Sequence, residues 1–199
     1  MQYLKEAEAI IDMVELDLSL RSELIKRGEL FNGYHAEMKK LQVANAAKLE
    51  KIISDIGYPT AERVGKEASA AAWMIIQHAI SCPPFMRKCL KLLKEAVNQG
   101  LGDPVELAYL TDRIATFEDR PQLYGTQFDW DQQGALSPKP YDDLTEVNRR
   151  REKIGLNSLE EQIGIMRCRA SQERETAPQD LSERSASYNA WRRRVGWIV

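Results

Sequence analysis

Apolar side chains recur at steps of three and four through the first part of the chain, which is the spacing of one face of an α-helix. After the turn "FNGYH" the pattern resumes, and "GYP" at residues 57–59 ends it. Two long helices that pair as a hairpin are therefore predicted. The first stripe is Leu4, Ala7, Ile11, Val14, Leu18, Arg21 and Ile25, and the second is Tyr34, Met38, Leu41, Asn45, Leu49, Ile52 and Ile56.

Further helices follow along the chain. The segment 66–80 has almost no polar side chain between Ala68 and Ile76, which is typical of a helix in the middle of a domain. The prolines of "CPPF" and the N-cap residue Asp103 mark the starts of the next two helices. Helices are thus predicted over 66–80, 83–100, 103–117, 143–156 and 158–174, with a short one near the C-terminus.

A small β-hairpin interrupts the helices. "QLYGTQF" and "ALSPKPY" are predicted to pair across the turn "DWDQQG", where Gly134 supplies a positive φ. The predicted fold is mainly α, a bundle-like single domain with one hairpin near residues 122–141. Its expected limits are 1–174, followed by a polar linker and a short helix over 175–199 that Trp191 and Trp197 dock on the body.

Charge and hydropathy limit the kinds of molecule that this chain is expected to bind. The 28 basic and 30 acidic residues give a net charge of −2, so no general attraction to nucleic acid or anionic lipid is expected. The longest apolar run, "ASAAAWMII", is too short to cross a bilayer, and the N-terminus lacks a signal-peptide pattern. A cytoplasmic protein is predicted, with a small-molecule ligand as the candidate partner.

Cysteine spacing and motif content argue against a metal or cofactor. Cys82 and Cys89 lie roughly 10 Å apart on one predicted helix, too far for a disulfide, and Cys168 makes the set odd. The chain has no phosphate loop, dinucleotide fingerprint, serine elbow or zinc-protease motif. We therefore predict reduced structural cysteines, no metal site and no cofactor.

Polar residues interrupt the apolar faces of the three clearest helices. These are Arg21, Asn45, and Gln77 with His78. Because a buried polar group without a partner costs about 1–3 kcal/mol, they should bond to one another, to water or to a ligand. One interpretation is a structural network in which Asp17 neutralises Arg21. The other is a polar pocket in which Arg21 holds a substrate, Asn45 and Gln77 orient it, and His78 is the acid or base.

Asp112 is the second candidate catalytic residue. The apolar stripe of its helix turns Asp112 to the opposite side, with Arg113 at the border. Asp112 either anchors the "YGTQ" segment by accepting hydrogen bonds from Thr126 or backbone amides, or lies on a solvated face. His35, the other histidine, is expected to cap a helix or lie at the surface.

The segment "YGTQ" carries the remaining candidate binding residues, Tyr124, Thr126 and Gln127, around Gly125. Glycine allows close approach of the backbone, and the side chains of Tyr124 and Gln127 offer hydrogen-bond donors. The segment is predicted to be a lid over the helical pocket, or else a plain hairpin that closes one end of the bundle.

Four stretches of the chain resemble a bacterial family of unknown function, DUF6624. They are "LFNGYHAEM", "IGYPTAERVGKEASAAAWMIIQHAI", "YLTDRIATFEDRPQLYGTQFDWD" and "VNRRREKIGL". Two positions depart from the family pattern, since Tyr58 stands where it has tryptophan and Lys66 separates Gly65 from Glu67. The resemblance implies no activity.

Two functions follow from these residues. The first is a small-molecule-binding enzyme that uses metal-independent acid-base chemistry in a polar pocket inside the helical domain. The alternative is a non-catalytic interaction or scaffold module, in which the same polar residues form a structural network.

Overall fold

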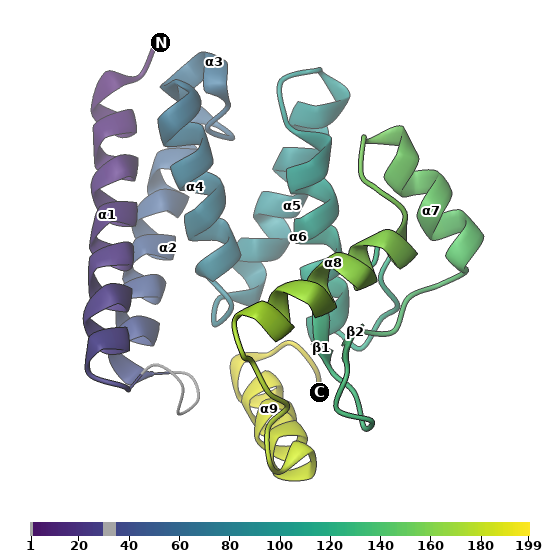
Figure 1. Cartoon of the computed structure of the whole chain (residues 1–199). Helices are drawn as coiled ribbons and strands as arrows, with labels where there is room; N and C mark the ends of the chain where they lie inside the picture. The colour runs from purple at the N-terminus through teal and green to yellow at the C-terminus, as the bar shows by residue number, and fades with distance from the viewer. Residues whose placement is uncertain (1, 30–34) are drawn as a thin grey trace. The chain divides into compact units, whose positions relative to one another are not determined.

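The computed structural model describes residues 2–29 and 35–199, and the described part contains nine helices and one two-stranded antiparallel sheet. The predicted mainly-α fold with a small β-hairpin is confirmed (Figure 1). The chain divides into two compact units, Met1–Asp103 and Pro104–Val199, which we describe separately. The predicted domain limits of 1–174 and 175–199 stay a prediction.

Helix α4 lies at the centre of the N-terminal unit. It packs against α1, α2, α3 and α5, which explains why its sequence is so poor in charged side chains. The elements are α1 (Leu4–Lys26), α2 (Ala36–Ile56), α3 (Ala61–Val64), α4 (Lys66–His78) and α5 (Pro83–Asn98).

The buried face of α1 differs from the predicted stripe. Arg21 is exposed, and the polar residue on the buried face is Asp17. The prediction was wrong because α1 is apolar on more than one side, so its periodicity fits two faces. The face that packs contains Ala7, Ile10, Met13, Val14, Asp17 and Leu24.

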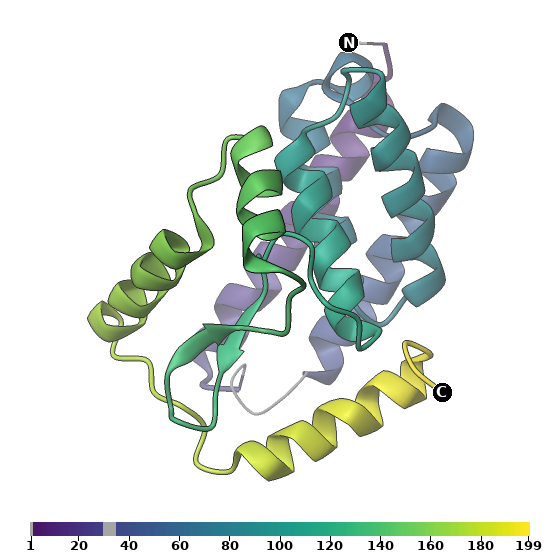
Figure 2. The ribbon, with the colours of Figure 1, turned by 90° about the vertical axis from the view of Figure 1, so that its right-hand side faces the viewer.

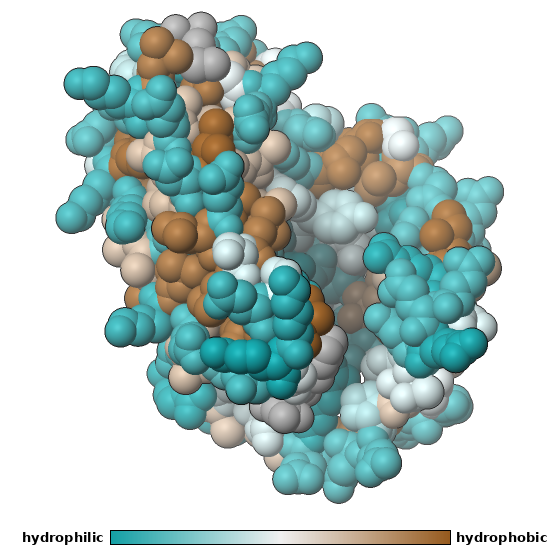
Figure 3. All heavy atoms as spheres, turned by 60° about the vertical axis from the view of Figure 1, so that its left-hand side comes forward, coloured by the Kyte–Doolittle hydropathy of each residue, from teal (hydrophilic) through white to brown (hydrophobic). Residues whose placement is uncertain are grey.

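The other apolar side of α1 is exposed. Leu4 is 60% accessible, Leu18 46% and Ile25 45%. Figure 3, which brings this side of the N-terminal unit forward, shows hydrophobic side chains gathered along it.

Helix α2 follows its predicted stripe more closely. Met38, Asn45, Leu49 and Ile56 are buried, whereas the predicted residue Tyr34 lies outside the described part. His35 is the N-cap, and its ring accepts a hydrogen bond from the Glu37 amide, as the sequence predicts.

The C-terminal unit combines helices with the hairpin. Its elements are α6 (Pro104–Phe117), β1 (Phe128–Trp130), β2 (Leu136–Pro138), α7 (Leu144–Lys153), α8 (Leu159–Gln172) and α9 (Leu181–Val195). Helix α8 packs against β2 and α7. Helix α9 extends from β1, where Arg184 pairs with Asp129, to the end of α6, where Arg192 pairs with Asp119 (Figure 2).

The hairpin is shorter than predicted. The strands pair from Phe128 opposite Pro138 to Trp130 opposite Leu136, and Gly134 has a φ of +73° in the turn. Residues 123–127, expected as strand, form a loop because their backbone amides donate to side chains instead of to a neighbouring strand.

Aromatic contacts join α9 and the residues after it to α6. The Phe117 ring stacks on Trp197 with centroids 4.9 Å apart and meets Trp191 edge-on at 5.5 Å. These are the two tryptophans that the sequence predicts will dock the C-terminal segment. Within the described ranges, no helix is both long enough and apolar enough to cross a membrane.

Candidate functional site

The predicted site residues fall into two sets, one in each unit. Arg21, Asn45, Gln77 and His78 belong to the N-terminal unit. Asp112, Arg113, Tyr124, Thr126 and Gln127 belong to the C-terminal unit. The predicted lid role of residues 124–127 over the helical pocket stays a prediction.

A histidine–aspartate pair links α4 to α1. His78 Nδ1 lies 2.8 Å from Asp17 Oδ2, although the two residues are 61 positions apart. The Asp17 side chain is 3% exposed and that of His78 is 29% exposed. The carboxylate is thus fixed inside the unit, and the imidazole extends from it to the surface. Sequence analysis missed this role of Asp17, because it placed Arg21 on the buried face.

Two successive turns of α1 carry the polar contacts of this set. Asn45 Nδ2 donates to the carbonyl of Met13 over 3.1 Å, and Met13 precedes Asp17 by one turn. Arg21 follows Asp17 by one turn but is exposed and lies off the buried face. Met13, Asp17 and Arg21 are thus about 6 Å apart along the helix axis.

The Asn45 side chain is only partly satisfied. Asn45 is 2% exposed, and its Oδ1 is buried without a hydrogen-bond partner in the described structure. Gln77, beside His78 on α4, is also buried. The interior next to Asp17 therefore holds an acceptor that a water or a ligand donor would satisfy.

The Asp112 carboxylate organises the second set. It is fully buried on α6 and accepts hydrogen bonds from the amides of Leu123, Tyr124 and Thr126, and from the Thr126 hydroxyl. The distances from the closest atoms run from 2.8 to 3.2 Å. The predicted anchoring of the loop by Asp112 is confirmed, and the catalytic role of Asp112 gains no support from these contacts.

Burial affects the ionisable groups around this anchor. It raises the pKa of Asp112, against the hydrogen bonds from the loop, which lower it. The pKa of Tyr124 is also raised, first by burial and then by the charge of Asp112. Both groups therefore hold a proton more tightly than they would in water.

Gln122 is a residue that sequence analysis missed. It is fully buried, its Nε2 donates to the carbonyls of Gln127 and Lys139, and its Oε1 accepts from the Gln127 amide. The side chain of Gln127 donates to Thr126 Oγ1 over 3.1 Å. The Gln122 side chain therefore links both ends of the loop. The sequence carries no signal for this role, because a glutamine among other polar residues looks like an ordinary surface residue.

Two arginines of α7 hold the other side of the loop. Arg151 is 2% exposed and donates to the carbonyls of Tyr124 and Asn157 and to Asn157 Oδ1. Arg150 donates to the Leu123 carbonyl and pairs with Asp142. We call residues 122–127 with these contacts the anchored loop.

Gly125 is required where the anchored loop meets α8. Its φ is +64°, and a Cβ on Gly125 would lie 2.8 Å from the Cδ1 of Leu159, which is fully buried. Both the backbone conformation and the space therefore exclude a side chain.

We expect Gly125→Ala to lower the free energy of unfolding by about 2–3 kcal/mol, because it adds a strained φ to an overpacked contact. Urea denaturation measures the change. Gly155→Ala is the matched control, since Gly155 has a φ of +76° but open space around it. The control should lose only about 1 kcal/mol, and equal losses for the two variants would contradict the role of Leu159.

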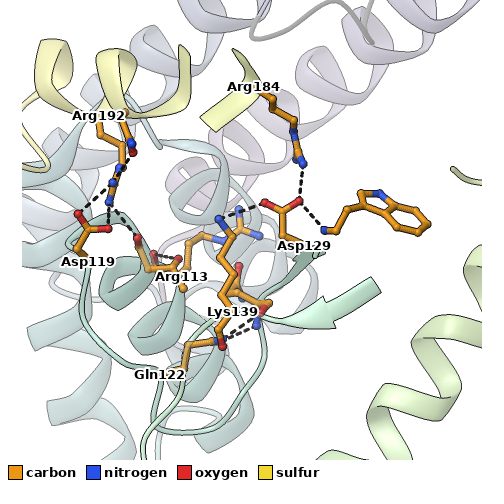
Figure 4. A network of polar contacts seen from close by, with 11 residues as sticks. Arg113, Asp119, Gln122, Asp129, Lys139, Arg184 and Arg192 are labelled. Atoms are coloured by element: carbon orange, nitrogen blue, oxygen red, sulfur yellow. Dashed lines mark hydrogen bonds and ion pairs between the residues drawn. The ribbon is translucent and has the colours of Figure 1, made fainter. Parts of the chain in front are cut away.

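Arg113, a predicted binding residue, lies in a network at α9 (Figure 4). Burial lowers the pKa of Arg113, and the neighbouring Tyr188 of α9 raises it. Nearby, burial alone would raise the pKa of Asp129, but Arg184 and Lys139 lower it below its ordinary value. Arg113 is therefore next to α9 and not on an open surface.

The Tyr188 hydroxyl should lose its proton only at a pH above the ordinary range of tyrosine. Burial, opposed by Arg192, raises its pKa from 10.0 to about 12. The folded protein holds this proton to a higher pH than the unfolded chain does. The contribution of Tyr188 to the free energy of unfolding is therefore fully present below pH 10 and is lost as the pH rises toward 12. We expect the wild type to lose about 1–2 kcal/mol more than Tyr188→Phe between pH 9 and 11.5. Urea denaturation of both proteins across this range measures it, and parallel curves would contradict it.

The cysteines are free thiols in three different settings. Cys89 is buried, which raises its pKa to about 12, Cys82 is half-buried and Cys168 is exposed. Across residues 2–29 and 35–199, no three histidine, cysteine, aspartate or glutamate side chains are grouped so that they could hold a metal ion.

The sequence model of one protein family matches residues 5–170, and this family, DUF6624, is described as one of unknown function. The chain belongs to this family. The match includes His78, Asp17, Asp112 and the anchored loop, whereas α9 lies beyond it. No curated protein and no solved structure matches the chain.

Proposed function

We propose that the chain is an enzyme for a small-molecule substrate, with His78 as its metal-independent general acid and base. The observation that supports this is the 2.8 Å contact between His78 Nδ1 and the buried Asp17 carboxylate. A carboxylate that accepts from Nδ1–H leaves the lone pair on Nε2, and the His78 side chain is 29% exposed.

The neighbouring groups supply binding roles in this proposal. Arg21, one turn from Asp17 and exposed, would hold an anionic or carbonyl group of the substrate. Asn45 and Gln77 would orient the ligand from the interior side, with the unsatisfied Asn45 Oδ1 accepting a donor. Asp17 is a positioning residue, since it acts through His78.

Acylation by diethyl pyrocarbonate tests the state of the His78 ring without a known substrate. The reagent modifies an imidazole nitrogen that carries a lone pair. We expect His78 to react about tenfold faster in the wild type than in Asp17→Asn, whose amide hydrogens favour the tautomer with the proton on Nε2. His35 is the matched control, since its side chain is 22% exposed and its Nδ1 already accepts from Glu37. Equal rates for His78 in both proteins would contradict the proposal.

A metabolite screen by thermal shift tests the binding part. A ligand that prefers the folded state raises its stability, and at 100 times the dissociation constant the gain is about 2.7 kcal/mol. We expect a hit whose stabilisation is lost in Arg21→Ala, and whose conversion is lost in His78→Gln with binding retained. Conversion that continues in His78→Gln would exclude His78 as the acid and base.

A second candidate function, a non-catalytic interaction module, is favoured by the apolar side chains that α1 exposes, Leu4, Leu18 and Ile25. In that case the polar residues would serve only as a structural network. The metabolite screen separates the candidates, because a purely structural His78 predicts no ligand whose conversion is lost in His78→Gln.

A further inference from the structure

Helix α1 carries a line of apolar side chains that its own unit leaves uncovered. Its members recur every seven residues, and we call them the heptad stripe: Leu4, Ile11, Leu18 and Ile25. Leu4, Leu18 and Ile25 are exposed, and Ile11 is partly exposed. Because seven residues make nearly two helical turns, the stripe is a single line that follows α1 for about 32 Å.

A repeat of seven is the spacing of helices that coil around each other. On one straight helix such a line drifts by about 20° per heptad, and a second helix wound around the first stays in contact with it. The residues three positions further on, Ala7 and Val14, are packed inside the unit. Only one position of each heptad is therefore free, so the stripe fits one long helix through a narrow, weak contact.

The charges of α1 are divided between its two ends. Residues 5–17 contain one basic and five acidic side chains, and residues 18–27 contain three basic and one acidic. Two helices with this division attract each other when they run antiparallel and repel each other when they run parallel. A second copy of α1 therefore has both the matching repeat and the matching charges.

We propose that two copies of the chain associate through their heptad stripes, with the two α1 helices antiparallel about a two-fold axis. One register sets Leu4 against Ile25 of the partner subunit, and it then sets Ile11 against Leu18 of the partner subunit. All of these residues belong to the N-terminal unit. The association does not depend on the acid-base role of His78.

This register also brings unlike charges together beside the stripe. Glu8 and Lys26 lie on the same side of the stripe, because they are eighteen residues, or five full turns, apart. Glu8 then lies about 8 Å along the axis from Lys26 of the partner subunit. Helical side chains lean toward the N-terminus of their own helix, so in an antiparallel pair these two lean toward each other.

One contact in this arrangement is unfavourable. Glu15 is exposed, lies beside the stripe four residues after Ile11, and is next to the two-fold axis. It therefore faces Glu15 of the partner subunit, and removing both charges should strengthen the association. In a parallel pair the two Glu15 side chains would lie on opposite sides of the contact, so this effect is specific to the antiparallel arrangement.

Sedimentation of the full chain between about 10 μM and 1 mM measures the association. We expect the wild type to form dimers in this range and Leu18→Glu to weaken them about tenfold or more, because it places a charge in the apolar contact. Glu15→Gln should strengthen them about twofold to fivefold.

Leu16→Glu is the matched control. Leu16 is 55% accessible on the same helix, but it lies about 160° around the axis from Leu18. Its substitution adds the same charge away from the stripe and should leave the association unchanged. Circular dichroism checks the folding of each variant, and Leu4→Glu, at the other end of the stripe, replaces Leu18→Glu if that variant does not fold.

Three results would overturn the proposal. The first is a wild type that stays monomeric at about 1 mM. The second is a folded stripe variant that dimerises like the wild type, or a Leu16→Glu that weakens the dimer as much as Leu18→Glu does. The third is a Glu15→Gln that fails to strengthen the dimer, which would exclude the antiparallel arrangement.

Discussion

Asp112→Ala should lower the free energy of unfolding by about 3–5 kcal/mol. The substitution leaves the amides of Leu123, Tyr124 and Thr126 without their acceptor inside a buried site. Each stranded donor costs about 1–3 kcal/mol, and entering water offsets part of the sum. For a chain of 199 residues this corresponds to a melting temperature lower by roughly 10 °C, which calorimetry measures.

Two further measurements locate the effect. Hydrogen exchange of the three amides should accelerate in Asp112→Ala, since they lose their common acceptor. Asp112→Asn should fall between the wild type and Asp112→Ala, because an amide has one acceptor oxygen in place of two. A loss below about 1 kcal/mol in Asp112→Ala would mean that Gln122 and Arg151 hold the loop without it.

Arg151→Ala should have an effect of similar size, about 3–5 kcal/mol. The guanidinium is almost fully buried and serves three acceptors, the carbonyls of Tyr124 and Asn157 and the side-chain oxygen of Asn157. Truncation removes all three charge-assisted bonds and leaves a cavity beside the anchored loop. Urea denaturation measures the loss.

The neighbouring arginine is the matched control. Arg150 lies on the same helix, and its contacts with Asp142 and with the Leu123 carbonyl are both exposed, so Arg150→Ala should cost less than about 1 kcal/mol. Arg151→Lys should cost an intermediate amount, because an ammonium cannot reproduce the planar fork. If Arg150→Ala and Arg151→Ala lose equal stability, burial of Arg151 is not the cause.

The helices of this chain were predictable because their start and stop residues and their spacing are local properties. The segment over α6 needs only its opening proline and the stripe through Ile114 to be recognised. The buried side of α1 was not predictable, since both Leu18 and Met13 belong to plausible stripes. Which one packs depends on α2 and α4, which no local window contains.

The candidate sites divide in the same way. The anchoring of the loop by Asp112 was predictable, because a short helix and a following loop place their polar groups close in sequence. The pairing of Asp17 with His78 was not, since the two residues are 61 positions apart and meet only through the packing register of α1 and α4. The pairing of Arg184 with Asp129 was not predictable either, since it depends on α9 returning to β1 and nothing in the composition of α9 indicates that contact.

The bonds to Asp112 have a consequence for how this region tolerates change. At Leu123 and Tyr124 the carboxylate accepts from the main chain, and only at Thr126 does it also bind a side chain. Leu123 is 39% accessible, so its side chain is free of the bonds that set the path of the backbone. Substitutions at Leu123 can alter what the loop presents while its path stays the same, which makes position 123 a natural place to vary in a selection for new binding specificity.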